Sequence, residues 1–234
     1  MIALNADVGE GIGNEAALFP LLDQCNIACG GHSGNTETMT QCIQLAQKYD
    51  VQIGAHPSFP DTLHFGRKVI TLSRKRLQET LTQQIKRIMT IAAAQNAKVV
   101  HIKPHGALYN LAATDEKTAT ILIETILQID DTLALFVPYD SLVAQLAAPR
   151  LKIVVEGFAD RAYTDTYTLV SRSKSGAVLE DVETILAHVK RLLNKELQTI
   201  SGHSIPIKLD TLCVHGDTPK AIKIATAIRH LLTK

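Results

Sequence analysis

Residues 98–128 read KVVHIKPHGALYNLAATDEKTATILIETILQ, a short apolar run followed by a longer amphipathic stretch. The run at 98–103 contains β-branched residues and stops at Pro104, which is typical of a buried strand. The stretch at 115–128 has the pattern of a helix. A strand followed by a helix is the unit from which proteins with a parallel sheet are built.

The same unit recurs along the chain. Further strands are predicted at 2–8, 26–29, 52–55, 133–137, 152–156 and 211–215, and further helices at 36–49, 73–96, 141–148, 180–196 and 219–232. This alternation predicts an α/β fold, a distorted seven-stranded parallel β/α barrel, with an open doubly wound sheet as the alternative. No linker or repeat is visible, so residues 1–234 are predicted to form a single barrel domain. The irregular stretches 157–179 and 197–210 are candidate lid segments.

The composition is that of an ordinary globular protein and excludes several functions. The net charge of +1 gives no electrostatic case for nucleic acid, and no apolar run is long enough to span a membrane. The four cysteines form no C-x-x-C pair, so a zinc knuckle is not expected. Because Met1 leads directly into a strand pattern, we expect no signal peptide, reduced thiols and a cytoplasmic location.

Polar residues follow six of the seven predicted strands. In a parallel barrel the carboxyl ends of the strands converge, so these residues are expected to share one mouth. Side chains two positions apart on a strand point the same way. Three such pairs stand at strand ends: Asn5 and Asp7, Lys103 and His105, and His215 and Asp217.

Lys103 is the strongest single candidate for a functional role. An ammonium group that ends an apolar strand before Pro104 is costly to bury without a partner. We therefore expect an acid, Asp7 or Asp217, or a bound anion beside it. Simpler interpretations stay open for two other candidates, because Asp7 could cap a turn and His32 could be an ordinary loop residue.

Six sequence blocks together resemble the signature of the LamB/YcsF family, in the family's order and over nearly the whole chain. They are NADVGE from Asn5, NIACGGHSG from Asn26, GAHPSFPD from Gly54, KPHGALYN from Lys103, FADRAY from Phe158 and CVHGDTP from Cys213. Gly31, Ser33 and residues 165–167 depart from the family's usual pattern, which puts loop details in question but not the resemblance.

The resemblance implies a seven-stranded β/α barrel that acts as the A component of a three-component, ATP-dependent 5-oxoprolinase, together with the B and C subunits. The reaction would convert 5-oxo-L-proline, ATP and water into L-glutamate, ADP and phosphate. Such chemistry needs acid, base and cationic groups. The catalytic candidates are Asp7 and Asp217 as bases, His56 and His105 as proton carriers, and Lys103 for a phosphate or oxyanion. The substrate-binding candidates are Asn5, His32, Glu156, Arg161 and His215. Among them, Arg161 would bind the substrate carboxylate in a two-pronged contact.

ATP is expected as a co-substrate, although the chain has no G-x-x-x-x-G-K-[ST] loop. Two alternatives remain. The first is a metal-dependent deacetylase or amidase, in which Asp7, His32 and His56 would hold the ion. The second is a non-catalytic subunit that presents substrate to its partners. Lys103 lies close to the proposed centre and disfavours a divalent cation, so no metal ligands are assigned and metal independence is expected.

Overall fold

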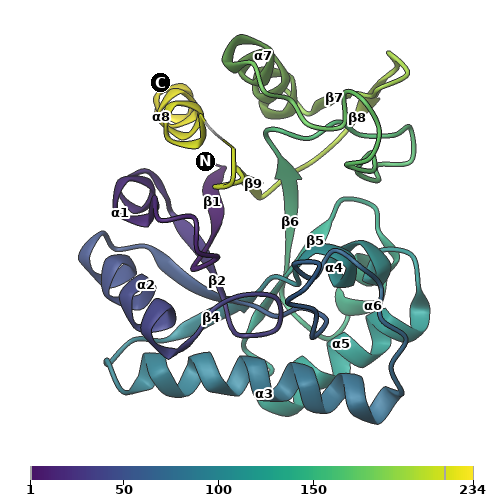
Figure 1. Cartoon of the computed structure of the whole chain (residues 1–234). Coiled ribbons are helices and arrows are strands. Elements are labelled where there is room, and N and C mark those ends of the chain that lie inside the picture. The colour runs from purple at the N-terminus through teal and green to yellow at the C-terminus, as the bar shows by residue number, and fades with distance from the viewer. Residues whose placement is uncertain (1, 219, 234) are drawn as a thin grey trace.

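The computed structural model describes residues 2–218 and 220–233. Within these residues, seven parallel strands close into a barrel (Figure 1). They are β1 (Ala3–Val8), β2 (Gln24–Ala28), β3 (Gln52–His56), β4 (Val99–Ile102), β5 (Ala134–Pro138), β6 (Ile153–Phe158) and β9 (Thr211–Cys213). Strand β9 lies between β6 and β1 and pairs parallel with both, so the sheet has no free edge. The predicted barrel is confirmed, and the open sheet is wrong.

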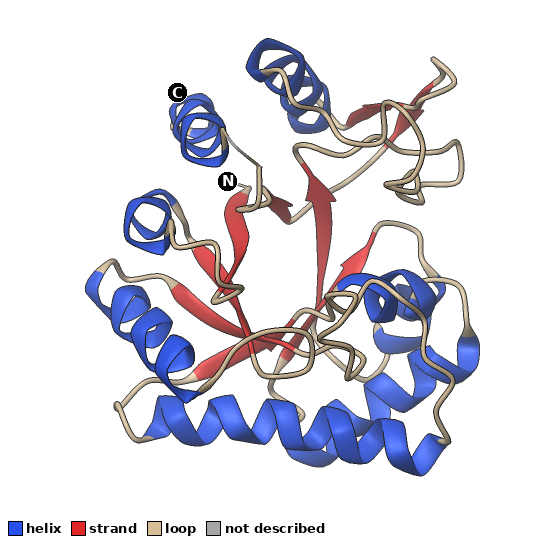
Figure 2. Cartoon of the chain, viewed as in Figure 1, coloured by secondary structure: helices blue, strands red, loops and turns tan. Residues whose placement is uncertain are grey.

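Helices surround the barrel (Figure 2). They are α1 (Glu15–Leu18), α2 (Thr36–Lys48), α3 (Arg74–Ala93), α4 (Gly106–Ala112), α5 (Glu116–Ile129), α6 (Leu142–Ala147), α7 (Val182–Leu193) and α8 (Ala221–Leu232), with a 3-10 turn η1 (Phe19–Leu21) after α1. Side-chain oxygens of Asn35, Ser73, Asp115, Ser141 and Asp181 accept a backbone N–H in the first turns of α2, α3, α5, α6 and α7. Each cap satisfies a donor that the helix leaves unpaired.

The helix predictions hold with local differences. Helices α1 and α4 were not predicted, because each has fewer than two turns of apolar pattern. The predicted helix at 180–196 ends at Leu193, and Glu196–Gln198 forms strand β7. The predicted start of the last helix at Pro219 lies outside the described residues, and α8 begins at Ala221.

The stretch at 197–210, expected to be irregular, contributes to a small hairpin. Strand β7 pairs antiparallel with β8 (Ser204–Pro206), separate from the barrel sheet. The stretch at 157–179 is largely irregular as predicted, although β6 continues to Phe158 and two isolated bridges, Arg161–Val178 and Tyr163–Leu169, tie the segment to itself. Both regions lie on the α7 side of the barrel (Figure 1).

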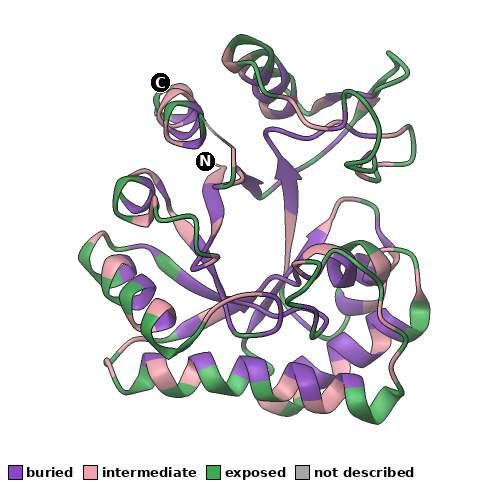
Figure 3. Cartoon of the chain, in the orientation of Figure 1, coloured by how far each residue is buried: buried purple, intermediate pink, exposed green. Residues whose placement is uncertain are grey.

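The strands of the barrel and the helix faces that pack on them are buried (Figure 3). The buried residues include an apolar layer between strands and helices and a polar layer inside the barrel. On β1, Leu4, Ala6 and Val8 alternate with Asn5 and Asp7, so the inner face is polar. The interior is also crowded. A Cβ atom at Gly54 would overlap the ring of His101, which explains a glycine in the middle of β3. Among the described helices, none is long and apolar enough to cross a membrane.

Candidate active site at the barrel mouth

A buried lysine lies between two carboxylates at the carboxyl end of the barrel. Nζ of Lys103 is 2.9 Å from Oδ1 of Asp7 and 2.8 Å from Oε1 of Glu156, and Lys103 is only 2% exposed. A third contact, at 3.1 Å, joins Nζ to Sγ of Cys213. An ammonium group has three donors. The expected acid partner Asp7 is therefore confirmed, and the alternative partner Asp217 is wrong.

A polar layer beneath this triad fixes Asp7. Nδ2 of Asn26 donates to Oδ1 of Asp7 and to Oδ1 of Asn5, both at 2.9 Å. Nε2 of His101 donates to Oδ1 of Asn26 at 2.8 Å, and its ring stacks on Phe136. Asn5 is fully buried in this layer, where its amide donates to Thr211. Asn5, predicted to bind substrate, is thus not among the residues that line the cavity, and it is linked to Asp7 through Asn26.

Three histidines and Glu10 gather above Asp7. Nε2 of His56 is 3.3 Å from Oδ2 of Asp7 and 2.9 Å from Nδ1 of His105. Nε2 of His32 is 2.8 Å from Oε1 of Glu10, and the His32 ring stacks on His105 with centroids 3.6 Å apart. The signal for Glu10 was present in the NADVGE block, where it follows Asp7 by three residues, but no role was assigned to it from the sequence.

These groups control one another's charge. Burial opposes ionisation of Asp7, yet His56 and Lys103 outweigh it and hold the pKa of Asp7 well below its ordinary value. Burial likewise opposes protonation of His56, but Asp7 raises the pKa of His56 above the usual range. Burial, reinforced by His56, lowers the pKa of His32 to about 3 and that of His105 well below normal. Burial and the charge of Asp7 raise the pKa of Glu10.

Asp7, Lys103, Glu156, His56 and His105 open onto one cavity of about 580 Å³, whereas His32 is not among its lining residues. Its wall includes eight of the ten residues predicted for the site: Asp7, His56, Lys103, His105, Glu156, Arg161, His215 and Asp217. A volume of this size suits a small-molecule site. The prediction that these residues line one cavity at the carboxyl ends of the strands is therefore confirmed for eight of them, while their individual roles stay predictions.

Cations line the outer part of this cavity. Arg67 and Arg172 lie 2.9 Å and 3.8 Å from Oδ2 of Asp217, and all three are partly exposed. Neither arginine was singled out from the sequence, because isolated arginines in loops resemble surface residues. Arg161 is buried, and its guanidinium donates to the carbonyl oxygens of Val170 and Ala177. Two of its donors therefore hold the segment that borders the cavity.

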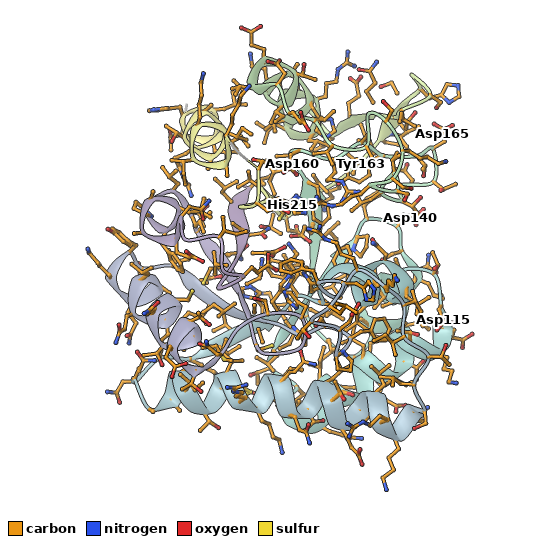
Figure 4. All side chains as sticks on the ribbon, in the orientation of Figure 1. Asp115, Asp140, Asp160, Tyr163, Asp165 and His215 are labelled. Carbon is orange, nitrogen blue, oxygen red and sulfur yellow. The ribbon has the colours of Figure 1, made fainter. Side chains whose placement is uncertain are left out.

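His215 has a buried acid partner. Nδ1 of His215 is 2.7 Å from Oδ1 of Asp160, and its ring stacks on Phe158. Burial works against the charge of Asp160, but His215 holds the pKa of Asp160 below its ordinary value. Figure 4 shows Asp160, Tyr163 and His215 together near β6 and β9, with Asp165 on the outer loop. Asp160 was quoted in the FADRAY block without a role.

A parallel β/α barrel with acid, base and cationic side chains at the carboxyl ends of its strands has the arrangement of an enzyme of this fold class. The model of the LamB/YcsF family matches residues 2–234, and the chain belongs to this family. The chain is 43% identical to the A subunit of a 5-oxoprolinase from Nitrobacter hamburgensis, over 99% of this chain and 94% of the relative. It is 39% identical to the corresponding 5-oxoprolinase component of Pyrococcus abyssi, over 99% and 93%.

Solved structures agree with this family assignment. A lactam utilization protein from Thermus thermophilus superposes with a TM-score of 0.91 at 33% identity, covering 99% of this chain and 96% of that protein. A putative cellobiose-phosphate cleavage protein from Enterococcus faecalis superposes with a TM-score of 0.58 at 12% identity, covering 97% and 90%. The second likeness shows the fold alone.

Proposed function

We propose that this chain is the A component of an ATP-dependent 5-oxoprolinase, which opens 5-oxo-L-proline to L-glutamate in an assembly with the B and C subunits. The observation that carries the proposal is one cavity in which Asp7, Lys103 and Glu156 lie beside a cluster of histidines. Relatives named as this component of 5-oxoprolinase, at 38–43% identity over nearly the whole chain, support the same substrate.

A five-membered lactam is a resonance-stabilised amide, and ATP can activate it by phosphorylating the carbonyl oxygen. Water must then be deprotonated and the ring nitrogen protonated. We assign this proton handling to Glu10, His56 and His105, which reach the cavity and lie within 3.8 Å of one another. Asp7 is a weak base because its pKa is low, so its role is to orient and charge His56.

We assign Lys103 a different role from the one predicted for it. Its Nζ atom already lies within 3.1 Å of Asp7, Glu156 and Cys213, so the ammonium group is not free to bind a phosphate. We assign it to positioning Asp7. The exposed guanidinium groups of Arg67 and Arg172 suit the substrate carboxylate or a phosphate of ATP, because arginine binds such groups in a two-pronged contact.

A reconstitution assay tests this function. L-Glutamate release from 5-oxo-L-proline and ATP is measured with this chain alone, with the B and C subunits only, and with all three. Because the chain has no P-loop, we expect release only from the complete mixture. Efficient ATP-dependent release by the isolated chain would contradict the need for partners. No release by the complete, folded mixture would contradict the substrate.

A further inference from the structure

His56 and His105 face each other nitrogen to nitrogen. Nε2 of His56 and Nδ1 of His105 are 2.9 Å apart. The other ring nitrogens lie 2.7 Å from the carbonyl oxygen of Lys103 and 2.9 Å from that of Phe65. A carbonyl oxygen only accepts, so each outer nitrogen must carry a proton. Two neutral rings would therefore point lone pairs at each other. One proton or one cation has to lie between them.

Glu10 completes a set of ligands around this point. Its Oε1 is 3.4 Å from Nδ1 of His105 and 3.8 Å from Nε2 of His56. With ligands at about 2.0–2.1 Å from a tetrahedral zinc ion, neighbouring ligand atoms stand roughly 3.3 Å apart. The three separations, 2.9, 3.4 and 3.8 Å, scatter around that edge length. One donor atom from each of Glu10, His32, His56 and His105 lies within 4.8 Å of the others.

The formal charges at the site match those that a divalent ion would offset. Asp7, Glu10 and Glu156 bring three carboxylates into a region where each side chain is at most 9% exposed. Lys103 supplies the single ammonium among these contacts. When Glu10 and both histidines give up their protons to bind an ion, as metal ligands must, the group carries two negative charges in excess. Buried charges require compensation, and a divalent cation supplies two positive charges where a proton supplies one.

The ring nitrogens of His56 and His105 that face away from this point make the contacts usual for metal-binding histidines. In such histidines the second nitrogen donates to a carbonyl or a carboxylate. His56 and His105 both donate outward to backbone carbonyls. His32 can donate to Glu10 at 2.8 Å, which would orient that carboxylate. Phe65 has a φ of +54°, uncommon for a bulky residue, and presents its carbonyl oxygen to His105.

We propose that Glu10, His56 and His105 bind one divalent transition-metal ion, with a coordination position open to the cavity. All three residues line that cavity, and a site with three protein ligands and an open position is of the catalytic kind. Nitrogen and carboxylate donors suit zinc and its neighbours among the transition metals. The set differs from Asp7, His32 and His56, because Asp7 is not among the residues whose donor atoms lie within 4.8 Å of one another at this point.

The proposal departs from the expectation of metal independence. In the metal-bound chain Glu10, His56 and His105 would serve as ligands instead of free acids and bases. The ion would acidify a bound water, which would give up the proton in their place. The binding site itself follows from the ring geometry and does not depend on the lactam substrate. Metal binding by the isolated chain and glutamate release by the assembly can therefore fail separately.

The test uses the full chain without an affinity tag, stripped with a chelator and titrated with Co²⁺ and Zn²⁺. We expect one equivalent of Co²⁺ to give visible ligand-field absorption, displaced by Zn²⁺, and saturating Zn²⁺ to raise the melting temperature. Loss of a group that hydrogen-bonds to a metal ligand weakens metal binding about 10–100-fold. Glu10→Gln and His105→Gln each remove a ligand itself, so each should weaken metal binding at least about 100-fold.

The matched control is His203→Gln, which removes an exposed histidine on the β7–β8 hairpin and should bind as the wild type does. Circular dichroism establishes that each variant is folded. Absence of a stoichiometric site in the wild-type chain would overturn the proposal. The same conclusion follows if folded Glu10→Gln and His105→Gln chains keep wild-type affinity, since the ions would then be bound elsewhere.

Discussion

Lys103, directly after β4, and Glu156, on β6, form an ion pair of 2.8 Å inside the barrel, with the carboxylate side chain fully buried. A lysine so enclosed is stable only because Glu156 and Asp7 offset its desolvation. Burial opposes the charge, but Asp7, Cys213 and Glu156 together hold the pKa of Lys103 well above its ordinary value. The ammonium group is therefore a permanent part of the site.

Replacing Lys103 with methionine tests this dependence. The change leaves two buried carboxylates without their cation, and breaking a buried pair in this way costs about 3–5 kcal/mol. For a chain of this size we expect the melting temperature to fall by roughly 6–20 °C. Calorimetry measures the shift. The double variant Lys103→Met/Glu156→Gln should recover part of it, and a single variant that melts like the wild type would contradict the ion-pair account.

The Asp160–His215 pair predicts a pH dependence of stability. Since His215 lowers the pKa of Asp160 in the folded chain, the stabilisation is present above the unfolded value near 3.8 and is lost as pH falls through the lower folded value. Urea unfolding should show a wild-type advantage over Asp160→Asn at neutral pH that shrinks in acid. If the stability difference between the wild type and Asp160→Asn instead grew as pH fell, the account of this pair would be contradicted. Asp131→Asn, at an exposed position, serves as the control.

Arg67 is expected to contact the anionic part of the substrate. A hydrogen bond to a charged group contributes about 1.5–3 kcal/mol, so Arg67→Met in the assembled enzyme should raise KM for 5-oxo-L-proline or ATP about 10–100-fold. Steady-state kinetics with each substrate varied in turn identifies which anion is bound. Arg74→Met, which removes a surface pair with Glu124 on α3 and α5, should leave both KM values unchanged. Unchanged values in Arg67→Met would exclude this role.

The sequence predicted the barrel and the end at which its site lies, because strand–helix alternation and polar strand ends are local patterns. Asp7, His56 and Lys103 line the cavity as predicted, since each lies on or directly after a strand whose register fixes its direction. Arg67 and Arg172 were missed, because they lie in long loops whose path depends on tertiary contacts.

Pairings were harder to predict than positions. Asp217 was predicted as a possible partner for Lys103 because both follow strands that were expected to end at the same barrel mouth. The side chain instead points outward to Arg67, and Glu156 on β6 takes the inner place. The choice between two acids at one mouth depends on distances of a few ångströms, which no periodicity in the sequence encodes.

Asp7→Asn is the most direct test of the claim that the barrel mouth acts on the lactam. The change keeps the shape and leaves Lys103 paired with Glu156, but removes the charge that raises the pKa of His56. ATP-dependent glutamate release is measured for this chain assembled with the B and C subunits, beside the wild type and Asp131→Asn. We predict that Asp7→Asn lowers kcat about 100-fold or more while assembly persists. Wild-type kcat in the Asp7→Asn assembly would contradict the account.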